Sequence, residues 1–361
     1  MKDNLKAMVL AAGVGSRLDP LTKRLPKPLI PVANRPVMEH ILMWLNEHGI
    51  KDVASNLHYL PEKIRNYFTF ECSLPGTVQF VNERVLSGDC GGLRACKSFF
   101  EPSRNGKKTT FVVAMGDIVT DVDLSLLVEE HRRSGALASI GLKRVEDVSQ
   151  FGVVCLNDKG YVEHFQEKPM PHEARSDLAN IGIYVFDSDI FKYMPDEGVY
   201  MFGKQLFPLL LGKQLPVRGV ELEGYWSDIG TMESYKQTCS DVLSGATGLM
   251  PRGAVLRSGD NKTVVARGQN VHIAPGVQLL GNVTIGDNCV IASGAVIKDS
   301  VLWANTIVGA GALIKDSVIA DGCRIKQQAH HVGEIVVDGL GGYQTSELNV
   351  VSINQSVKLA S

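Results

Sequence analysis

Apolar and polar positions alternate along the first 230 residues in the pattern of an α/β fold. Apolar runs of strand length, such as 8–10 and 109–115, are separated by amphipathic stretches with a helical period. The stretch 35–48 is one predicted helix, with Asn34 as its cap and Gly49 at its end. Elements that alternate in this way predict a mostly parallel sheet covered on both faces, with ligands bound beyond the carboxyl ends of the strands.

A different period begins after residue 265. Small or apolar residues recur every six positions from Val271 to Ile325, and a second apolar series begins at Ile273. Repetition of this kind predicts a parallel β-helix whose turns bury columns of apolar side chains. Trp303 interrupts the second column, and we expect it to face another domain. We therefore expect an α/β domain over 1–242, a linker over 243–264, a β-helix over 265–330 and a tail over 331–361.

Composition and charge narrow the class of protein. The 361 residues are 44% hydrophobic and 21% charged, as in globular proteins with two substantial cores. A formal net charge of −2 argues against nucleic acid or an anionic membrane as partner. No apolar run approaches the roughly 20 residues of a membrane-spanning helix, and the first residues lack the apolar core of a signal peptide. The seven cysteines include no C-x-x-C pair, which predicts reduced thiols in the cytoplasm and no zinc site.

The first predicted strand runs into a glycine-rich, basic loop. Gly13 and Gly15 allow backbone N–H groups to turn toward an anion. Four cations follow within a dozen residues: Arg17, Lys23, Arg24 and Lys27. We interpret the loop as a cradle for a polyphosphate. A dinucleotide-binding fingerprint is disfavoured because Leu18 stands where its third glycine is needed, and a Walker loop because Gly-Lys-Ser/Thr is absent.

Further motifs follow this loop in a fixed order. They are the glycine loop 87–93, Gly116-Asp117 after an apolar strand, Glu167-Lys168-Pro169, Asn180-x-Gly-x-Tyr184 and Trp226-x-Asp228-x-Gly230. With the pattern G-x-G-x-R-L-x-P-L-T-x-x-x-P-K-P they resemble the sugar-1-phosphate nucleotidyltransferases. The period-six repeat makes the chain most similar to the mannose-1-phosphate guanylyltransferase branch. This resemblance implies a Rossmann-like nucleotidyltransferase domain followed by a left-handed parallel β-helix.

The resemblance also implies a role for each motif. The residues implied to bind the nucleotide are Leu10, Ala11, Ala12, Gly13, Gly15, Ser16, Gly88, Asp89 and Gly91. Those implied to act in catalysis are Arg17, Lys27 and Asp117. Those implied to bind the sugar phosphate are Gly152, Glu167, Lys168 and Asn180. Asp117 and Asp228 are the implied ligands of a Mg²⁺ ion, because a hard divalent cation that binds phosphates prefers carboxylate oxygens.

The implied reaction joins a sugar 1-phosphate to a nucleoside triphosphate and releases pyrophosphate. The attacking phosphate is already ionised, so positioning and charge neutralisation are sufficient for catalysis. Two alternatives remain open. A hexapeptide acyltransferase would use His272 or His330, and a non-catalytic sugar-nucleotide sensor would bind without turnover. Retention of the implied catalytic and metal-binding residues argues against the sensor.

Asp89 departs from the small residues usual in the second glycine loop. If its carboxylate faces the base, it can only accept hydrogen bonds, and guanine presents two adjacent donor groups. This hint favours GTP with mannose 1-phosphate over UTP or dTTP with glucose 1-phosphate. If Asp89 instead faces solvent, the glycine backbone reads the base. The flat strand faces of the β-helix lead us to expect a homo-oligomer.

Overall fold

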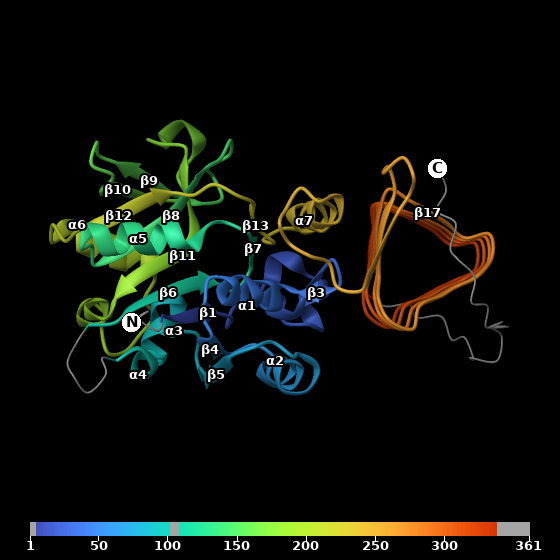
Figure 1. Ribbon diagram of the computed structural model, residues 1–361, viewed down its shortest axis with the longest axis horizontal. Coiled ribbons are helices and arrows are strands. Elements are labelled where there is room, and N and C mark those ends of the chain that lie inside the picture. Colours follow the sequence, from blue (N-terminus) through green and yellow to red (C-terminus); the bar gives the residue numbers. More distant parts are fainter. Residues whose placement is uncertain (1–4, 102–107, 338–361) are drawn as a thin grey trace. The chain divides into compact units, whose positions relative to one another are not determined.

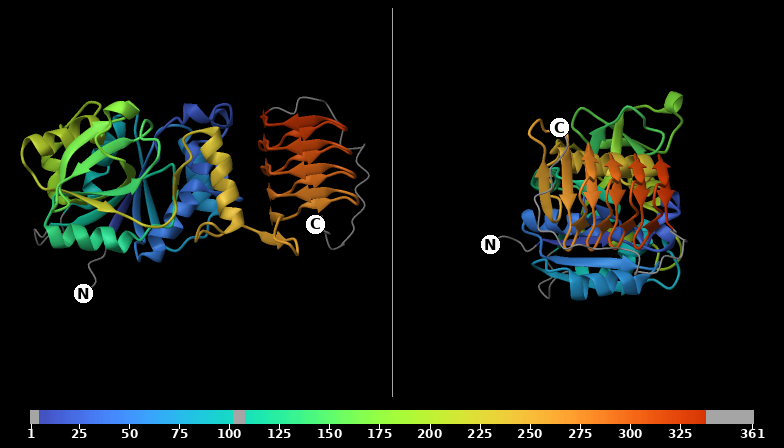
Figure 2. Two further views of the ribbon diagram at one scale, coloured as in Figure 1. Left: turned by 90° about the horizontal axis from the view of Figure 1, so that it is seen from above. Right: turned by 90° about the vertical axis from the view of Figure 1, so that its right-hand side faces the viewer.

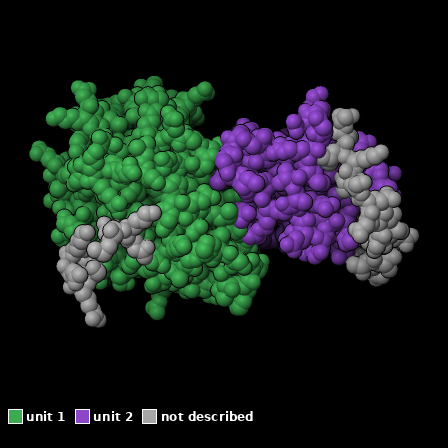
Figure 3. Space-filling view, viewed as in Figure 1, with its two compact units in different colours: residues 1–14, 26–29, 37–226 green, residues 15–25, 30–36, 227–361 purple. Residues whose placement is uncertain are grey.

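The computed structural model describes residues 5–101 and 108–337, which form two compact units (Figure 3). Unit 1 comprises 1–14, 26–29 and 37–226, and unit 2 comprises 15–25, 30–36 and 227–361. The units therefore interleave along the chain, because two short N-terminal segments belong with the C-terminal residues. Strand β13 (Trp226–Asp228) crosses from one unit to the other. Among the described residues, no helix has the length and apolar character needed to cross a membrane.

Unit 1 is built on a nine-stranded sheet against which helices pack (Figure 1). Seven strands lie in the order β10-β9-β11-β6-β1-β4-β5, while β8 pairs with β11 and β12 pairs with β8. The strands of this sheet are β1 (Lys6–Leu10), β4 (Asp52–Leu57), β5 (Thr77–Asn82), β6 (Thr110–Met115), β8 (Ala138–Arg144), β9 (Gly152–Leu156), β10 (Val162–Glu167), β11 (Leu178–Asp187) and β12 (Val217–Glu221). The short β7 (Ile118–Thr120) lies outside it.

Helices of unit 1 connect these strands. They are α1 (Val37–Glu47), α2 (Pro61–Asn66), α3 (Gly88–Ala95), α4 (Lys97–Phe100), α5 (Leu124–Ser134) and α6 (Phe207–Gly212). Short 3₁₀ or π turns add η3 (Lys27–Leu29), η4 (Tyr67–Glu71), η5 (Pro171–Glu173), η6 (Ser188–Tyr193) and η7 (Phe202–Leu206). Apolar side chains from the sheet and from these helices form a core in which Met8, Phe111 and Phe186 are fully buried.

The predicted α/β fold is confirmed, and its parallel pairs join β6, β1, β4 and β5 in one run and β8 with β12 in another. Leu10 pairs with Met115, so β1 and β6 end at the same edge of the sheet. The second half differs from the expectation, because β11 runs antiparallel to β6 and β8, and β10 runs antiparallel to β9. The motifs from Gly152 to Asn180 lie on these antiparallel strands.

Helix α1 begins two residues later than the sequence predicts. Arg35 and Pro36 form strand β3 (Arg35–Pro36), which pairs with β2 (Pro31–Val32). Asn34 has a φ of 68° in the turn between them, so it is not the helix cap. Its side-chain amide donates instead to the carbonyl of Ile285 at 2.9 Å. The prediction was wrong here because a contact 251 residues away determines the local conformation.

The C-terminal part of unit 2 is a parallel β-helix, triangular in cross-section (Figure 1) and built from stacked coils (Figure 2). One sheet contains β14 (Ala254–Arg257), β15 (Val264–Arg267), β18 (Asn282–Ile285), β21 (Val301–Leu302), β24 (Val318–Ile319) and β27 (Ile335–Val336). A second contains β16 (His272–Ile273), β19 (Val290–Ile291), β22 (Ile307–Val308) and β25 (Arg324–Ile325). The third contains β17 (Gln278–Leu280), β20 (Val296–Lys298), β23 (Leu313–Lys315) and β26 (His330–Val332).

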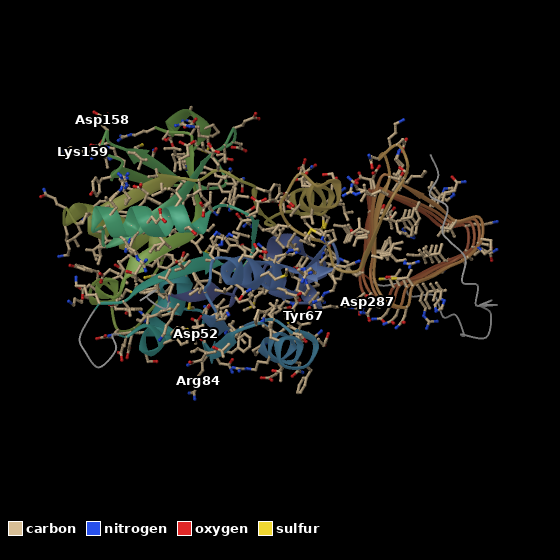
Figure 4. All side chains as sticks on the ribbon, in the orientation of Figure 1. Asp52, Tyr67, Arg84, Asp158, Lys159 and Asp287 are labelled. Carbon is tan, nitrogen blue, oxygen red and sulfur yellow. The ribbon has the colours of Figure 1, made fainter. Side chains whose placement is uncertain are left out.

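Corners of the coils place residues in the left-handed backbone region, which asparagine tolerates better than most side chains. Asn270, Asn288 and Asn305 occupy equivalent corners with φ of 52°, 58° and 58°. Their amides form a ladder, with Nδ2–Oδ1 distances of 3.2 Å from Asn270 to Asn288 and 3.2 Å from Asn288 to Asn305. Asp287, which is labelled on the β-helix in Figure 4, accepts from the backbone N–H of Gln269. Stacked coils thus satisfy each other's polar groups.

The strict period of six does not hold through the β-helix. The first coil advances 18 residues, from Val264 to its partner Asn282, and the next advances 17, from Thr284 to Val301. Because the second coil is one residue shorter, the register against the preceding coil changes by one residue. A change of one residue moves a side chain to the other face of a strand. Val308 and Ile314 are therefore fully buried, whereas the predicted column members Ile307 and Leu313 are only half-buried.

Helix α7 (Met232–Ser244) joins the β-helix within unit 2. Trp303 donates from its indole nitrogen to the Tyr235 hydroxyl at 2.9 Å, so the interruption of the apolar column faces this helix. Tyr235 in turn donates to the carbonyl of Pro31 at 2.8 Å. These bonds attach the β2–β3 hairpin to the C-terminal part of the chain. Unit 2 also contains the turns η1 (Ser16–Leu18) and η2 (Leu21–Lys23).

Candidate active site

The carboxyl ends of β1 and β6 form the centre of the candidate site in unit 1. The Gly116 N–H donates to the Leu10 carbonyl at 2.9 Å, and a Cβ at Gly116 would lie 2.3 Å from that oxygen. Only glycine fits this approach. The chain then places Asp117 beside Lys27 of η3, with Nζ 2.7 Å from Oδ2. Two of the three residues expected to act in catalysis are therefore brought together.

The Lys27–Asp117 pair is partly removed from water. The Lys27 side chain is 10% exposed and the Asp117 side chain is 26% exposed. Charges in such surroundings interact more strongly than on an open surface, and each depends on the other for compensation. The pair supplies a cation and a carboxylate at the strand ends, where α/β sheets bind ligands.

The first glycine loop leaves Leu10, Ala11 and Ala12 buried and Gly13 exposed. Among the described residues, and apart from its two chain neighbours, none has an atom within 4 Å of the position that a Gly13 Cβ would occupy. Internal packing therefore does not require glycine at this position, whereas close approach of a ligand to the backbone would. This observation agrees with the predicted polyphosphate cradle.

A partly buried polar network connects the two glycine loops. The Ala11 N–H donates to Asn56 Oδ1 at 3.0 Å, and Asn56 Nδ2 donates to Glu83 Oε1 at 2.5 Å. Glu83 Oε2 accepts from the Ser87 N–H at 3.2 Å and from the Ser87 hydroxyl. Neither Asn56 nor Glu83 was predicted as a site residue from the sequence. Asn56 stands near the carboxyl end of an apolar strand, the same signal that singled out Asp117.

The second glycine loop is the first turn of a helix. Helix α3 begins at Gly88, so Gly88, Asp89 and Gly91 are helical. Asp89 Oδ1 accepts from the Phe202 N–H at 2.7 Å and from the Cys90 N–H at 2.6 Å. Burial of the carboxyl raises the pKa of Asp89 to about 6, and these two hydrogen bonds oppose that rise.

The residues expected to bind sugar phosphate lie on β9, β10 and β11. A Cβ at Gly152 would lie 2.6 Å from the Phe165 ring and 3.5 Å from Glu167 Oε2. The Lys168 N–H donates to the Phe151 carbonyl at 3.1 Å, and Lys168 has a φ of 48°. Gly152 and Glu167 thus lie together, and Lys168 leaves the end of β10 through a tight backbone turn.

Asn180 is held by its own strand. Its Nδ2 donates to the Tyr184 hydroxyl at 2.9 Å, and its Oδ1 accepts from the Gly182 N–H at 3.0 Å. The register of β11 against β8 shifts between Asn180 and Tyr184. The N-x-G-x-Y motif therefore forms a local irregularity in β11, where its side chains bond one another.

Unit 2 contains the remaining predicted residues. Gly15 precedes η1 with a φ of 73°, and its carbonyl accepts from the Thr22 hydroxyl at 3.1 Å. Ser16 and Arg17 are exposed. A Cβ at Gly230 would lie 3.2 Å from Arg17 Nη1 and 3.0 Å from Asp228 Oδ2. Arg17 and Asp228 therefore both lie close to Gly230.

Asp117 and Asp228 offer the oxygen ligands that Mg²⁺ prefers. Within residues 5–101 and 108–337, no group of three or more His, Cys, Asp or Glu side chains could hold a metal ion. Mg²⁺ is often held by one or two carboxylates together with substrate phosphates and waters. Each of the two carboxylates provides oxygen donors of this type, Asp117 in unit 1 and Asp228 in unit 2.

The histidines of the acyltransferase alternative do not converge. His272 lies on β16 and His330 on β26, in different sheets of the β-helix, and both are exposed.

Comparison with known proteins agrees with this geometry. Residues 6–245 match the family described as nucleotidyl transferase, and residues 262–356 match the GMPPB C-terminal domain. The chain belongs to the nucleotidyl transferase family, and it is an enzyme of the sugar-1-phosphate nucleotidyltransferase type. The resemblance inferred from the motifs is confirmed.

Individual relatives differ in substrate. A UTP–glucose-1-phosphate uridylyltransferase from Synechocystis is 36% identical over 83% of this chain and 83% of its own length. A mannose-1-phosphate guanylyltransferase from Mycobacterium tuberculosis is 30% identical over 82% of this chain and 79% of its own. A Bacillus anthracis structure provisionally assigned as a glucose-1-phosphate thymidylyltransferase gives a TM-score of 0.58 at 26% identity, covering 65% of this chain and 94% of that one. The structure of HddC from Yersinia pseudotuberculosis, at 21% identity over 66% of this chain and 99% of that one, gives a TM-score of 0.56 and supports the fold.

Proposed function

We propose that the chain transfers the guanylyl group of GTP to mannose 1-phosphate and releases pyrophosphate. The observation that carries this choice is the match of residues 262–356 to the GMPPB C-terminal domain. The guanylyltransferase from Mycobacterium tuberculosis, similar over most of both chains, supports it. Asp89 lends less support than the sequence suggested, because its Oδ1 already accepts two backbone N–H groups.

UTP with glucose 1-phosphate is the second candidate. It is favoured by the Synechocystis uridylyltransferase, which is 36% identical to this chain. The two candidate reactions share the same chemistry. Their substrates differ only in the base and in the configuration of one sugar hydroxyl, so the same site residues serve both.

In the proposed reaction a phosphate oxygen of the sugar 1-phosphate forms a bond to the α-phosphorus of the triphosphate. The bond from the α-phosphorus to the bridging oxygen breaks, and pyrophosphate leaves with that electron pair. Lys27 and Arg17 hold the triphosphate, while Lys168 holds the sugar phosphate and Glu167 accepts from sugar hydroxyls. These charges allow two anions to approach, which is the main barrier to the reaction.

Asp117 and Asp228 would hold Mg²⁺. The ion supplies charge neutralisation and orientation to phosphate oxygens when it is bound. The fit rests on the hard oxygen donors of both carboxylates.

A substrate grid tests the proposal. Pyrophosphate release is measured for GTP, UTP, dTTP and ATP, each with mannose 1-phosphate and glucose 1-phosphate, at saturating Mg²⁺. The highest kcat/KM is expected for GTP with mannose 1-phosphate. A preference for UTP with glucose 1-phosphate would select the second candidate, and no release with any pair would contradict nucleotidyl transfer itself.

A further inference from the structure

The first turn of α3 is joined by backbone bonds to the segment 200–203. The Tyr200 N–H donates to the Ser87 carbonyl at 2.9 Å, and the Gly91 N–H donates to the Tyr200 carbonyl at 3.1 Å. A Cβ at Gly88 would lie 2.5 Å from the same Tyr200 carbonyl. The second glycine loop is therefore packed directly against this segment.

The Asp89 side chain adds a contact that the backbone alone does not make. Its Oδ1 accepts from the N–H of Phe202, the first residue of η7, across 113 positions of sequence. The side chain of the preceding residue, Met201, makes no capping hydrogen bond to this turn. Asp89 therefore provides the acceptor for the start of η7, in the way that a helix cap does within one segment.

The start of η7 lies against residues proposed to bind the sugar. A Cβ at Gly203 would lie 2.3 Å from Glu167 Oε2 and 3.0 Å from the Phe165 ring. The Phe202 ring lies 5.1 Å from the ring of Tyr184, centroid to centroid, and Tyr184 accepts from Asn180. A displacement of η7 would thus be transmitted to both Glu167 and Tyr184.

We propose that Asp89 is a positioning residue for the sugar side of the site. By holding the Phe202 N–H it sets Gly203 against the Glu167 carboxylate, and it links the second glycine loop to the sugar pocket. The inference rests on the proposed function, in which Glu167 and Lys168 bind the sugar phosphate. It assigns Asp89 a role other than acceptance of hydrogen bonds from guanine.

The test separates the acceptor oxygen of Asp89 from its charge. Asp89→Ala removes the acceptor, and Asp89→Asn keeps an Oδ1 without the charge. We expect Asp89→Ala to raise the KM for the sugar 1-phosphate about tenfold, the effect of one hydrogen bond, and to leave the KM for the triphosphate within about twofold. Asp89→Asn should restore the wild-type KM for the sugar. Asp123→Ala, which removes an acceptor for the Ser125 N–H on α5, is the matched control and should change neither KM.

Gly203→Ala provides an independent variant in case Asp89→Ala does not fold. Its added methyl collides with Glu167 Oε2, so the KM for the sugar 1-phosphate alone should rise. If Asp89→Asn raises the KM for the triphosphate as Asp89→Ala does, the carboxylate charge acts on the nucleotide and the proposal is overturned. It is also overturned if neither Asp89→Ala nor Gly203→Ala changes the KM for the sugar. Failure of the proposed sugar site is recognised separately, because Lys168→Ala would then leave that KM unchanged.

Discussion

At the scale of single residues, the strand ends concentrate charge that is only partly solvated. Lys27 and Asp117 lie 2.7 Å apart with most of each side chain covered. Replacement of Asp117 removes the carboxylate that compensates the Lys27 ammonium, and it removes a group proposed to act on the phosphates.

Replacement of the carboxylate should therefore stop turnover. We expect Asp117→Asn to lower kcat by more than about 100-fold, the scale of one lost electrostatic contact in a transition state. Asp228→Asn should act in the same way, because it removes the second proposed ligand of Mg²⁺. Asp187→Asn, at the far end of β11, is the control and should retain activity. Near-normal rates of both site variants at saturating Mg²⁺ would contradict the metal assignment.

Lys168 should affect one substrate only. Its ammonium is proposed to hold the phosphate of the sugar, so Lys168→Ala should raise the KM for the sugar 1-phosphate by roughly 10- to 150-fold, the effect of a lost charge-assisted hydrogen bond. Lys159→Ala is the matched control, since this exposed lysine follows β9 at a turn. Weakened binding of the triphosphate instead would mean that Lys168 serves the other substrate.

At the scale of elements, helix α5 is joined to strand β8 by a buried pair. His131 Nδ1 lies 2.9 Å from the Ser139 hydroxyl, and burial lowers the pKa of His131 to about 4. The folded state therefore keeps this imidazole neutral at a pH where the unfolded chain already binds a proton. The contribution of His131 to the free energy of unfolding is therefore present above pH 6.5 and is lost as the pH falls toward 4.

A pH series of chemical unfolding measures this loss. Relative to His131→Gln, the wild type should lose about 2 to 3 kcal/mol of unfolding free energy between pH 7 and pH 4. His172→Gln is the control, because His172 is exposed and its variant should follow the wild type. Parallel curves for wild type and His131→Gln would show that His131 does not contribute to acid sensitivity.

At the scale of the whole molecule, the N-terminal segments 15–25 and 30–36 depend on the C-terminal half of unit 2. Asn34 donates to carbonyls of Ala266 and Ile285, and the Arg252 N–H donates to the Ala33 carbonyl. The segment 15–25, which carries Arg17, belongs to the same unit as this hairpin. The β-helix also exposes strand faces suited to contacts between copies, and we propose that the chain is a homo-oligomer.

Truncation after Gly245 tests both statements. The shortened chain should keep a folded unit 1, because that unit has its own core, but it should melt at a lower temperature and lose activity as the hairpin loses its partners. Light scattering should report a smaller assembly than for the full chain. An unchanged number of subunits would refute the role of the β-helix in assembly, and unchanged activity would refute the dependence of the Arg17 segment on it.

The sequence by itself determined the class of fold, the family and most of the chemistry. Glycines at strand ends, Asp117 after an apolar run and the repeat after residue 265 are local signals, because strand alternation, turn conformation and coil length are encoded by neighbouring residues. The pairing of Lys27 with Asp117 was predictable to the extent that both motifs lie at the carboxyl edge of one sheet.

Only the tertiary structure decided which residues support this chemistry. Asn56 meets Glu83, and Asp89 meets Phe202, through contacts 27 and 113 residues apart that leave no periodic pattern. The one-residue shortening of the coils placed Val308 rather than Ile307 in the buried column, since the register against the previous coil decides which side chains point inward. Asn34 lies in a hairpin turn rather than at a helix cap because its amide donates to the Ile285 carbonyl. Long-range hydrogen bonds at these positions outweigh local preferences, which differ by about 1 kcal/mol or less.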